Sequence, residues 1–310
     1  MFRDYVRIAR PDHWLKNVFV LPGAVFAWWA CPPSNPLVAL GWVALSLLSV
    51  CLVCSSNYTI NEILDARYDR EHPEKKLRPA AMGRIRPAVG YAQWLVLAAA
   101  GMGLGMLVNV PFLVVALTLW IAGIAYNVRP VRLKDRPLMD VLSESVNNPL
   151  RLLLGWYAVC STTFPPASLL LSYWMLGAFF MAIKRFAELR HIGRDGVAAA
   201  YRKSFAYYTE ERLLIGIMFY ATACAMLGGV FLIRYKVELM LSVPFLAGFM
   251  AYYLHLGFLP NSPAQYPERL PRQRFFFLYG ILTVVVVIVC LFIRLPWLDR
   301  LFEPTIPTGL

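Results

Sequence analysis

Charged side chains are scarce in this sequence. Asp, Glu, Lys and Arg make up 15% of the 310 residues, against 59% for hydrophobic types, whereas soluble globular domains carry about 25% charged residues. This shortage excludes an ordinary water-soluble domain and predicts that most of the chain lies in a lipid bilayer. The net charge of +12 is spread over short segments between apolar runs, so it does not form the concentrated basic patch of a nucleic-acid-binding domain.

The sequence also lacks the signatures of several kinds of enzyme site. It contains no Gly-rich phosphate-binding loop and no nucleophile elbow, and its four histidines are too scattered to form a metal-ligand set. Cys51 and Cys54 form a C-x-x-C pair, but no second pair or nearby histidine accompanies it, so we interpret both as small residues in helix packing. We expect no cleavable signal peptide, because Pro22 and Gly23 interrupt the first apolar run.

Long apolar runs dominate the rest of the sequence. A membrane-spanning helix needs about 20 residues, and most of the runs reach that length, although the first and the fifth are the least regular. The runs cover residues 17–31, 37–60, 88–108, 111–128, 138–160, 167–190, 212–233, 239–258 and 275–298. The pattern predicts an all-α, polytopic membrane protein, a bundle of about nine transmembrane helices that forms a single membrane domain over residues 1–310.

Basic residues predict the orientation of this bundle. Most Lys and Arg residues fall in the amino-terminal segment and around 61–87, 129–137, 191–211 and 259–274, whereas the intervening connections are short and carry little charge. By the positive-inside rule, the amino terminus is cytoplasmic and, with nine spans, the carboxyl terminus lies outside. We expect residues 1–16 to form an amphipathic interfacial segment, and 61–87 and 191–211 to form cytoplasmic loops that cap an active site.

A stripe of oxygen-bearing side chains lies at the start of the first of these loops. Residues three and four apart share a face of a helix, and Asn61, Glu62, Asp65 and Asp69 follow this spacing. Such carboxylates suit Mg²⁺, which takes its other oxygen ligands from water and substrate phosphates. The alternative is a solvated helix whose charges pair among themselves. The basic residues that follow the stripe are Arg67, Arg70, Lys75, Lys76 and Arg78.

The fifth apolar run carries the clearest set of charges inside the membrane. Such residues cost about 2.5–3.5 kcal/mol each at the bilayer centre on insertion scales, so by default they mark function. Asp140, Glu144 and Arg151 follow helical spacing along one face, and Pro149 can kink the helix. The alternative is a polar contact in which Glu144 pairs with Arg151, which would leave Asp140 without a partner.

Further polar residues stand at the cytoplasmic ends of other predicted spans. Lys184 and Glu188 are four residues apart and can pair on one helix, which would leave Arg185 to bind a phosphate with its planar fork. The remaining candidates of this kind are Lys16, Tyr126 and Lys134. For the two lysines, interfacial anchoring and positive-inside charge are equally good explanations.

These motifs resemble those of the UbiA superfamily of intramembrane prenyltransferases. That family's first motif is N-D-x-x-D-x-x-x-D, and here the sequence reads Asn61-Glu62-x-x-Asp65-x-x-x-Asp69, with Glu62 in place of Asp. The spacing of its second motif, D-x-x-x-D, is matched by Asp140 and Glu144. Three segments are most similar to the decaprenyl-phosphate 5-phosphoribosyltransferase branch, while SESVNNPLR fits that branch less closely. They are RPDHWLKN at 10–17, DREHPEKKLRPAAMG at 69–83 and KRFAELRHIG at 184–193.

The resemblance implies a reaction and a cofactor. A 5-phosphoribosyl group would pass from phosphoribosyl diphosphate (PRPP), entering from the cytoplasm, to the phosphate of a polyprenyl phosphate in the membrane, with release of diphosphate. Mg²⁺ on the diphosphate would be held by Asn61, Glu62, Asp65, Asp69 and Asp140. The implied catalytic residues are Asp65, Asp69, Asp140, Lys184 and Arg185. The implied substrate-binding residues are Lys16, Asn61, Glu62, Lys75, Arg78, Tyr126, Lys134, Glu144, Arg151 and Glu188.

Two other functions stay open on the sequence. The first is a transferase of the same fold that moves a polyprenyl group from its diphosphate to an aromatic or other small acceptor. The second is a non-catalytic lipid-binding protein or transporter, although transporters tend to carry paired interrupted helices near the midplane. The resemblance further implies a bacterial plasma-membrane protein of cell-envelope biosynthesis, with its active site facing the cytoplasm, no nucleic-acid partner, and a homo-oligomer as an open alternative.

Overall fold

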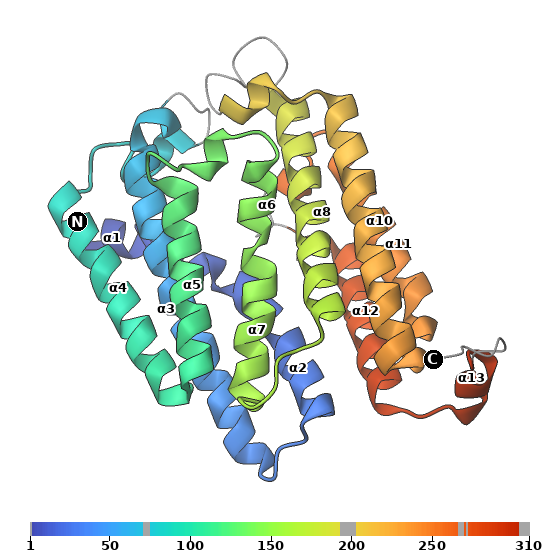
Figure 1. Cartoon of the computed structure of the whole chain (residues 1–310). Helices are drawn as coiled ribbons and strands as arrows, with labels where there is room; N and C mark the ends of the chain where they lie inside the picture. The colour runs from blue at the N-terminus through green and yellow to red at the C-terminus, as the bar shows by residue number, and fades with distance from the viewer. Residues whose placement is uncertain (1, 71–74, 193–202, 266–269, 271, 304–310) are drawn as a thin grey trace.

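The computed structural model describes residues 2–70, 75–192, 203–265, 270 and 272–303. Within these ranges it contains helices and no strand, so the all-α prediction is confirmed (Figure 1). The helices are α1 Phe2–Ile8, η1 Pro11–Val20, α2 Leu21–Ala30, α3 Pro36–Asp69, η2 Lys75–Leu77, α4 Pro87–Val108, α5 Val110–Asn127, η3 Leu133–Asp135, α6 Met139–Ser145, α7 Asn147–Val159, α8 Ala167–Ile192, η4 Lys203–Ala206, α10 Glu210–Tyr235, η5 Val237–Ser242, α11 Val243–Phe258, η6 Pro263–Gln265, α12 Arg274–Phe292 and α13 Pro296–Leu301.

Among the described residues, seven helical segments are long and apolar enough to cross a membrane. They are α3, α4, α5, α8, α10, the continuous η5–α11 segment and α12. The first predicted span passes from η1 into α2 without a gap, and the fifth is interrupted at Val146, between α6 and α7; neither is among these seven. Pro149 accounts for the break in the fifth span, because it offers no N–H to the carbonyl of Ser145 and its ring crowds that carbonyl. Seven of the nine predicted spans are therefore supported by length and composition.

The predicted capping loops begin at different residues from those expected. α3 continues to Asp69, so the stripe from Asn61 to Asp69 lies on the last turns of a helix of 34 residues and the loop begins only at Arg70. The second segment, 191–211, begins inside α8, which ends at Ile192. Residues 71–74 and 193–202 of these two predicted loops, His72 and Pro73 included, lie outside the described residues.

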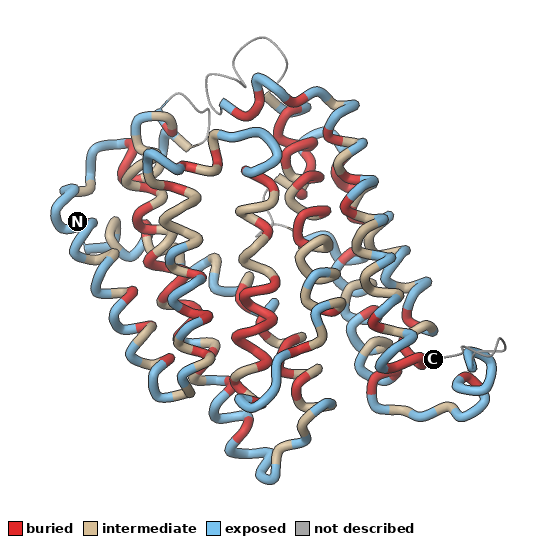
Figure 2. The backbone as a smooth tube through the Cα atoms, viewed as in Figure 1, coloured by how far each residue is buried: buried red, intermediate tan, exposed pale blue. Residues whose placement is uncertain are grey.

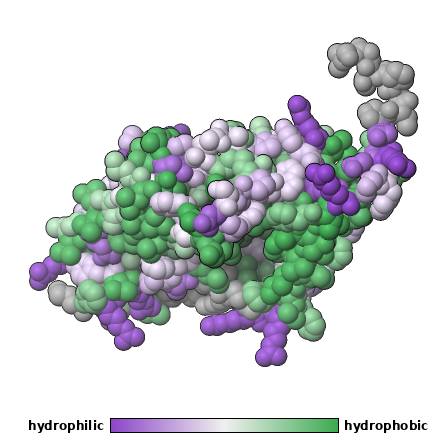
Figure 3. Space-filling view, turned by 90° about the horizontal axis from the view of Figure 1, so that it is seen from below, coloured by the Kyte–Doolittle hydropathy of each residue, from purple (hydrophilic) through white to green (hydrophobic). Residues whose placement is uncertain are grey.

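The bundle has two halves that meet at α7 and α8 (Figure 1). In one half, a buried apolar cluster joins α3, α5 and α7. In the other, a second cluster joins α8, α10 and α11. Buried positions follow the facing sides of the helices, whereas the outer sides are exposed (Figure 2). The exposed outer sides are largely apolar: Leu95 on α4, Phe219 on α10 and Val284 on α12 are all exposed, and Figure 3 shows broad hydrophobic flanks suited to lipid.

Two glycines let α2 and α7 approach each other closely. A Cβ atom added at Gly23 of α2 would lie 1.9 Å from the carbonyl oxygen of Leu152 on α7. A Cβ atom at Gly155 of α7 would lie 1.9 Å from the carbonyl oxygen of Val20. Since neither backbone leaves room for a side chain, both positions require glycine, as is usual where membrane helices pack backbone to backbone.

Candidate active site

The two aspartates at the end of α3 are paired with basic side chains from other segments. Arg132 and Lys134 contact Oδ1 of Asp65 at 3.0 and 2.5 Å. Arg78 contacts Oδ2 of Asp69 at 2.6 Å. The partners come from segments after α3 and around η3, so the alternative of a solvated helix that pairs its own charges is wrong. The cationic side chains are at most 25% exposed, which strengthens these pairs relative to surface ones.

Asn61 and Glu62 extend the stripe deeper into the bundle. Nδ2 of Asn61 donates to Oδ1 of Asn127 at 2.5 Å, and Oε2 of Glu62 accepts from Arg10 at 3.1 Å. The other carboxylate oxygen of Glu62, Oε1, is buried and has no hydrogen-bond partner within the described part of the chain. A buried carboxylate oxygen without a hydrogen bond destabilises the folded protein, and a bound cation would give this oxygen a partner.

These residues fit Mg²⁺ only if a phosphorylated substrate shares the ion. Across the described ranges, no three His, Cys, Asp or Glu side chains lie close enough to hold a metal by themselves. Magnesium in phosphate-binding sites needs only one or two carboxylates, because water and phosphate oxygens complete its shell. Asp65 and Asp69, one helical turn apart, and the buried Oε1 of Glu62 offer that donor set.

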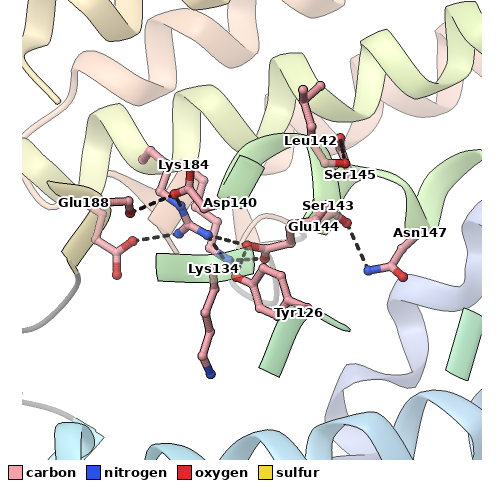
Figure 4. Close-up of polar contacts among 12 residues, drawn as sticks. Tyr126, Lys134, Asp140, Leu142, Ser143, Glu144, Ser145, Asn147, Lys184 and Glu188 are labelled. Carbon is pink, nitrogen blue, oxygen red and sulfur yellow. Dashed lines mark hydrogen bonds and ion pairs between the residues drawn. The ribbon is translucent and has the colours of Figure 1, made fainter. Parts of the chain in front are cut away.

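A second charged cluster joins Asp140 and Glu144 of α6 to Lys184 and Glu188 of α8 (Figure 4). The Arg185 side chain is 1% exposed, and its guanidinium pairs with Asp140 at 3.2 Å, with Glu188 at 2.9 Å and with Glu144. Nζ of Lys184 contacts Oε1 of Glu144 at 2.9 Å. One buried arginine is thus shared by three carboxylates.

This cluster shows pairings that differ from those considered in the sequence. Arg185 is not left to meet a phosphate, because three carboxylates already contact its guanidinium. Lys184 pairs with Glu144 instead of Glu188. Glu144 does not pair with Arg151, because Glu144 faces α8 whereas Arg151 faces α3.

Asp140 was expected to hold metal, and in the structure protein donors surround it. It is completely buried, and its Oδ2 accepts from Arg185 at 3.2 Å and from Ser204 at 3.1 Å, while Oδ1 accepts from Tyr208. Burial, together with the Asp140 charge, raises the pKa of Tyr208 above its usual range, so the phenol stays protonated as a donor. This arrangement favours Asp140 as a positioning residue for Arg185.

Sequence reasoning missed Ser204 and Tyr208 as members of the site. Both lie in the predicted capping segment 191–211, but no spacing rule connects a residue there with the fifth span. Tyr208 also accepts a hydrogen bond from the backbone N–H of Leu138 at 2.8 Å. The segment after η4 therefore closes over the start of α6.

The two charged clusters are connected through Tyr126, Lys75 and Lys134. The hydroxyl of Tyr126 donates to Oε2 of Glu144 at 2.9 Å, and Nζ of Lys134 lies 5.8 Å from the centre of the Tyr126 ring. Nζ of Lys75 contacts Glu188 at 3.4 Å. The stripe on α3 and the carboxylates of α6 and α8 therefore belong to one site at one end of the bundle.

Arg151 lies deeper and has a different environment. It is 8% exposed; its Nε donates to Oδ1 of Asn17 at 3.2 Å and a terminal nitrogen lies 3.6 Å from Sγ of Cys54. Nδ2 of Asn17 in turn donates to Sγ of Cys51 at 3.2 Å. No carboxylate of the described residues forms an ion pair with Arg151, so a buried positive charge has only neutral partners there. The two cysteines are free thiols in this polar contact.

The remaining residues of η1 tie the amino-terminal segment to α3. Nε1 of Trp14 donates to Oγ of Ser55 at 2.9 Å. Nζ of Lys16 lies 3.2 Å from Nδ1 of His13, and the His13 ring packs edge-on against Tyr58 with centroids 5.1 Å apart. Lys16 is half-buried and turned toward this inner group, which favours the site over the lipid headgroups among the two explanations for it.

Comparison with known proteins identifies relatives of this chain. Residues 19–281 match the UbiA prenyltransferase family. The chain is 30% identical over 226 residues to decaprenyl-phosphate phosphoribosyltransferase of Mycobacterium tuberculosis, covering 72% of each protein. It is 25% identical to protoheme IX farnesyltransferase of Xanthomonas axonopodis pv. citri, over 74% of this chain and 84% of that one.

The fold has a solved counterpart. The structure of a UbiA homolog from Archaeoglobus fulgidus bound to GPP and Mg²⁺ superposes with a TM-score of 0.70 and 20% identity, and the match covers 94% of this chain and 100% of that one. At that identity the likeness concerns the fold alone. The family match over most of the chain, with seven candidate membrane helices, shows that this chain is an integral membrane protein of the UbiA prenyltransferase family.

Proposed function

We propose that this protein transfers 5-phosphoribosyl from PRPP to the phosphate of a polyprenyl phosphate and releases diphosphate, with Mg²⁺ as cofactor. The activity named for the Mycobacterium tuberculosis relative supports this choice. The donor would enter from the cytoplasm and the acceptor from the membrane. The amino terminus would be cytoplasmic, the carboxyl terminus outside, and the membrane a bacterial plasma membrane, in keeping with the positive-inside distribution of charge.

The proposal rests on the positions of the basic side chains, which lie at two different levels along the helix axes. Arg151 lies seven residues after Glu144, and its neighbour Cys54 lies seven residues before Asn61. Seven residues of helix rise about 10 Å, so Arg151 is about two turns deeper than both polar stripes. The shallow cations are Lys75, Arg78, Arg132 and Lys134. A donor with a diphosphate and an acceptor that is itself a phosphate call for two anion sites, whereas prenyl transfer to an uncharged acceptor calls for one.

The donor would bind at the shallow site. Asp65, Asp69 and Oε1 of Glu62 would hold Mg²⁺, which when bound neutralises charge on the leaving diphosphate as the C1–O bond breaks toward an oxocarbenium-like state. Arg78 and Lys134 now neutralise the two aspartates. With PRPP and Mg²⁺ bound, Arg78 and Lys134 would contact the phosphate oxygens, and the two aspartates would contact the metal ion instead of these basic side chains.

The acceptor phosphate would bind at Arg151, whose buried guanidinium suits two phosphate oxygens at once. A lipid phosphate is already an anion at neutral pH, so the attacking oxygen needs no general base. Glu144, which is 23% exposed and contacts Tyr126, Lys184 and Arg185, would accept from the ribose hydroxyls. The polyprenyl tail would lie along the apolar flanks seen in Figure 3.

The direct test is to incubate the purified protein with labelled PRPP and decaprenyl phosphate. We expect a phosphoribosyl lipid and an equal amount of diphosphate when Mg²⁺ is present, and neither product when it is chelated. Omission of either substrate serves as the control.

The alternative function is transfer of a polyprenyl group from its diphosphate to an aromatic or other small acceptor. One finding favours it: a protoheme IX farnesyltransferase is among the relatives. The same incubation with a polyprenyl diphosphate and candidate ring acceptors separates the two functions. Consumption of the prenyl diphosphate, with no phosphoribosyl lipid from PRPP, would replace our proposal by this one.

A further inference from the structure

The end of the bundle opposite the charged site brings together two cysteines that the proposed function does not use. Cys31 follows the last residue of α2, and Cys160 follows the last residue of α7. These two helices pack backbone to backbone at Gly23 and Gly155, so their ends arrive side by side. Both cysteines belong to one small apolar cluster with Trp156.

The two thiols lie on either side of one hydroxyl group. Oγ1 of Thr163 is 3.6 Å from Sγ of Cys31 and 3.1 Å from Sγ of Cys160. The backbone at Thr163 is fixed, because Nε1 of Trp156 donates to its carbonyl oxygen at 2.8 Å. The two sulfur atoms therefore both contact the Thr163 hydroxyl.

Each of the two thiols also changes the pKa of the other. Burial raises the pKa of Cys31, and the neighbouring Cys160 raises it further. Although burial works in the same direction on Cys160, hydrogen bonds from Cys31 and from the hydroxyls of Thr163 and Thr162 lower the pKa of Cys160 to about 7. At neutral pH a large part of Cys160 is then thiolate, which is the nucleophilic form in disulfide exchange.

We propose that Cys31 and Cys160 are joined by a disulfide bond in the mature protein. The connections at 31–36 and 160–166 lie at the end of the bundle that we expect outside the cytoplasm, where disulfides form and persist. The oxidant is a disulfide, carried by a thiol oxidoreductase or a small molecule. The Cys160 thiolate attacks one of its sulfurs and expels the other as a thiolate; the Cys31 thiolate then attacks the mixed disulfide and expels the second. The two protons pass to the two released thiols, so electrons and atoms balance.

The bond would join the outer ends of two short helices, α2 and α7. α2 and α7 have 10 and 13 residues, so each is held by fewer backbone hydrogen bonds than the long helices. A cross-link between residues 31 and 160 closes a long loop and restricts the unfolded chain most strongly for such separations. This inference does not depend on the substrate of the enzyme.

The experiment is to treat intact cells that produce the full chain with N-ethylmaleimide, to lyse and denature them in the same reagent so that every free thiol is alkylated, and then to digest and map the peptides by mass without reductant. We expect a linked pair of peptides containing Cys31 and Cys160, with neither cysteine alkylated, while Cys224 and Cys290 carry the label. Cys31→Ser should make Cys160 available to the reagent, and Cys160→Ser should do the same for Cys31.

A second measurement follows the effect of the bond. Reduction of the purified protein should lower its thermal midpoint by about 5 °C, and the same reductant should leave the midpoint of Cys31→Ser unchanged. If Cys31 and Cys160 of the unreduced wild type are both alkylated in the peptide map, the proposal is wrong. That result would leave the phosphoribosyl-transfer assay unaffected, so failures of the two proposals are distinguishable.

Discussion

The shallow and deep parts of the site differ in the partners of their basic side chains. At the end of α3, Asp65 and Asp69 each contact a basic side chain from another segment. About two turns deeper, Arg151 is held by an amide and a thiol, with no carboxylate partner among the residues that the structure describes. A buried charge without a counter-charge costs several kcal/mol. The shallow part is therefore balanced without a ligand, whereas the deep part is balanced only by an anion that binds there.

The largest effect should follow from removing the shallow carboxylates. Asp65→Asn or Asp69→Asn should lower the rate of phosphoribosyl-lipid formation by about 10³-fold, because the charge that holds Mg²⁺ on the leaving diphosphate is lost. Initial rates over a range of Mg²⁺ concentrations measure this. Asp135→Asn is the matched control, since Asp135 contacts the same Arg132 at 3.0 Å but lies outside the stripe. Full activity in both stripe variants would remove the metal role.

The next largest effect should be on stability, at Arg185. Arg185→Met would leave Asp140, Glu144 and Glu188 without their shared cation, so we expect the free energy of unfolding to fall by about 3–5 kcal/mol. Arg190→Met on the same helix is the control. Arg190 pairs with Glu210 at 3.1 Å but is 40% exposed, and its loss should cost less than about 1 kcal/mol. Equal losses, measured by unfolding in mixed micelles, would contradict the central role of Arg185.

The contrast between the two depths is sharpest at Arg151. Arg151→Met removes an uncompensated buried charge, so stability should be unchanged or higher. The same variant should lose activity by about 10²-fold, or about 3 kcal/mol, because the lipid phosphate loses its cation. The loss should appear in the KM for the polyprenyl phosphate and leave the KM for PRPP unchanged. Arg151→Lys should recover part of the activity. An equal rise in both KM values would place Arg151 outside the acceptor site.

Local spacing was enough to predict much of this site. Helical periodicity placed Asn61, Glu62, Asp65 and Asp69 on one face, and hydropathy located the seven long helices. Spacing did not show that α6 and α7 are separate helices, although Pro149 indicated a kink there. We had associated interrupted helices with transporters. Interrupted helices are thus compatible with this family and do not by themselves identify a transporter.

The ion-pair and hydrogen-bond partners of the charged side chains could not be predicted from residue spacing in the sequence. Lys184 and Glu188 are ideally spaced to pair on one helix, but Glu144 on α6 lies closer to Lys184 in the folded bundle. Asp140 finds Ser204 and Tyr208, more than 60 residues away. These contacts depend on how α6, α8 and the segment after η4 pack together, and no local rule specifies that packing.

The smallest of these effects, and the most specific, should come from giving Arg151 the counter-charge that it lacks. Oδ1 of Asn17 already accepts from Nε of Arg151 at 3.2 Å, so Asn17→Asp places a carboxylate there with little change in shape. The new pair should raise stability by about 1–2 kcal/mol and lower activity by about tenfold, because the carboxylate competes with the lipid phosphate and repels it. Asn17→Ala is the control, since it loses the same amide without adding charge. If Asn17→Asp instead keeps the wild-type KM for the polyprenyl phosphate, the anion that balances Arg151 is not the acceptor, and the two depths of the site do not correspond to its two substrates.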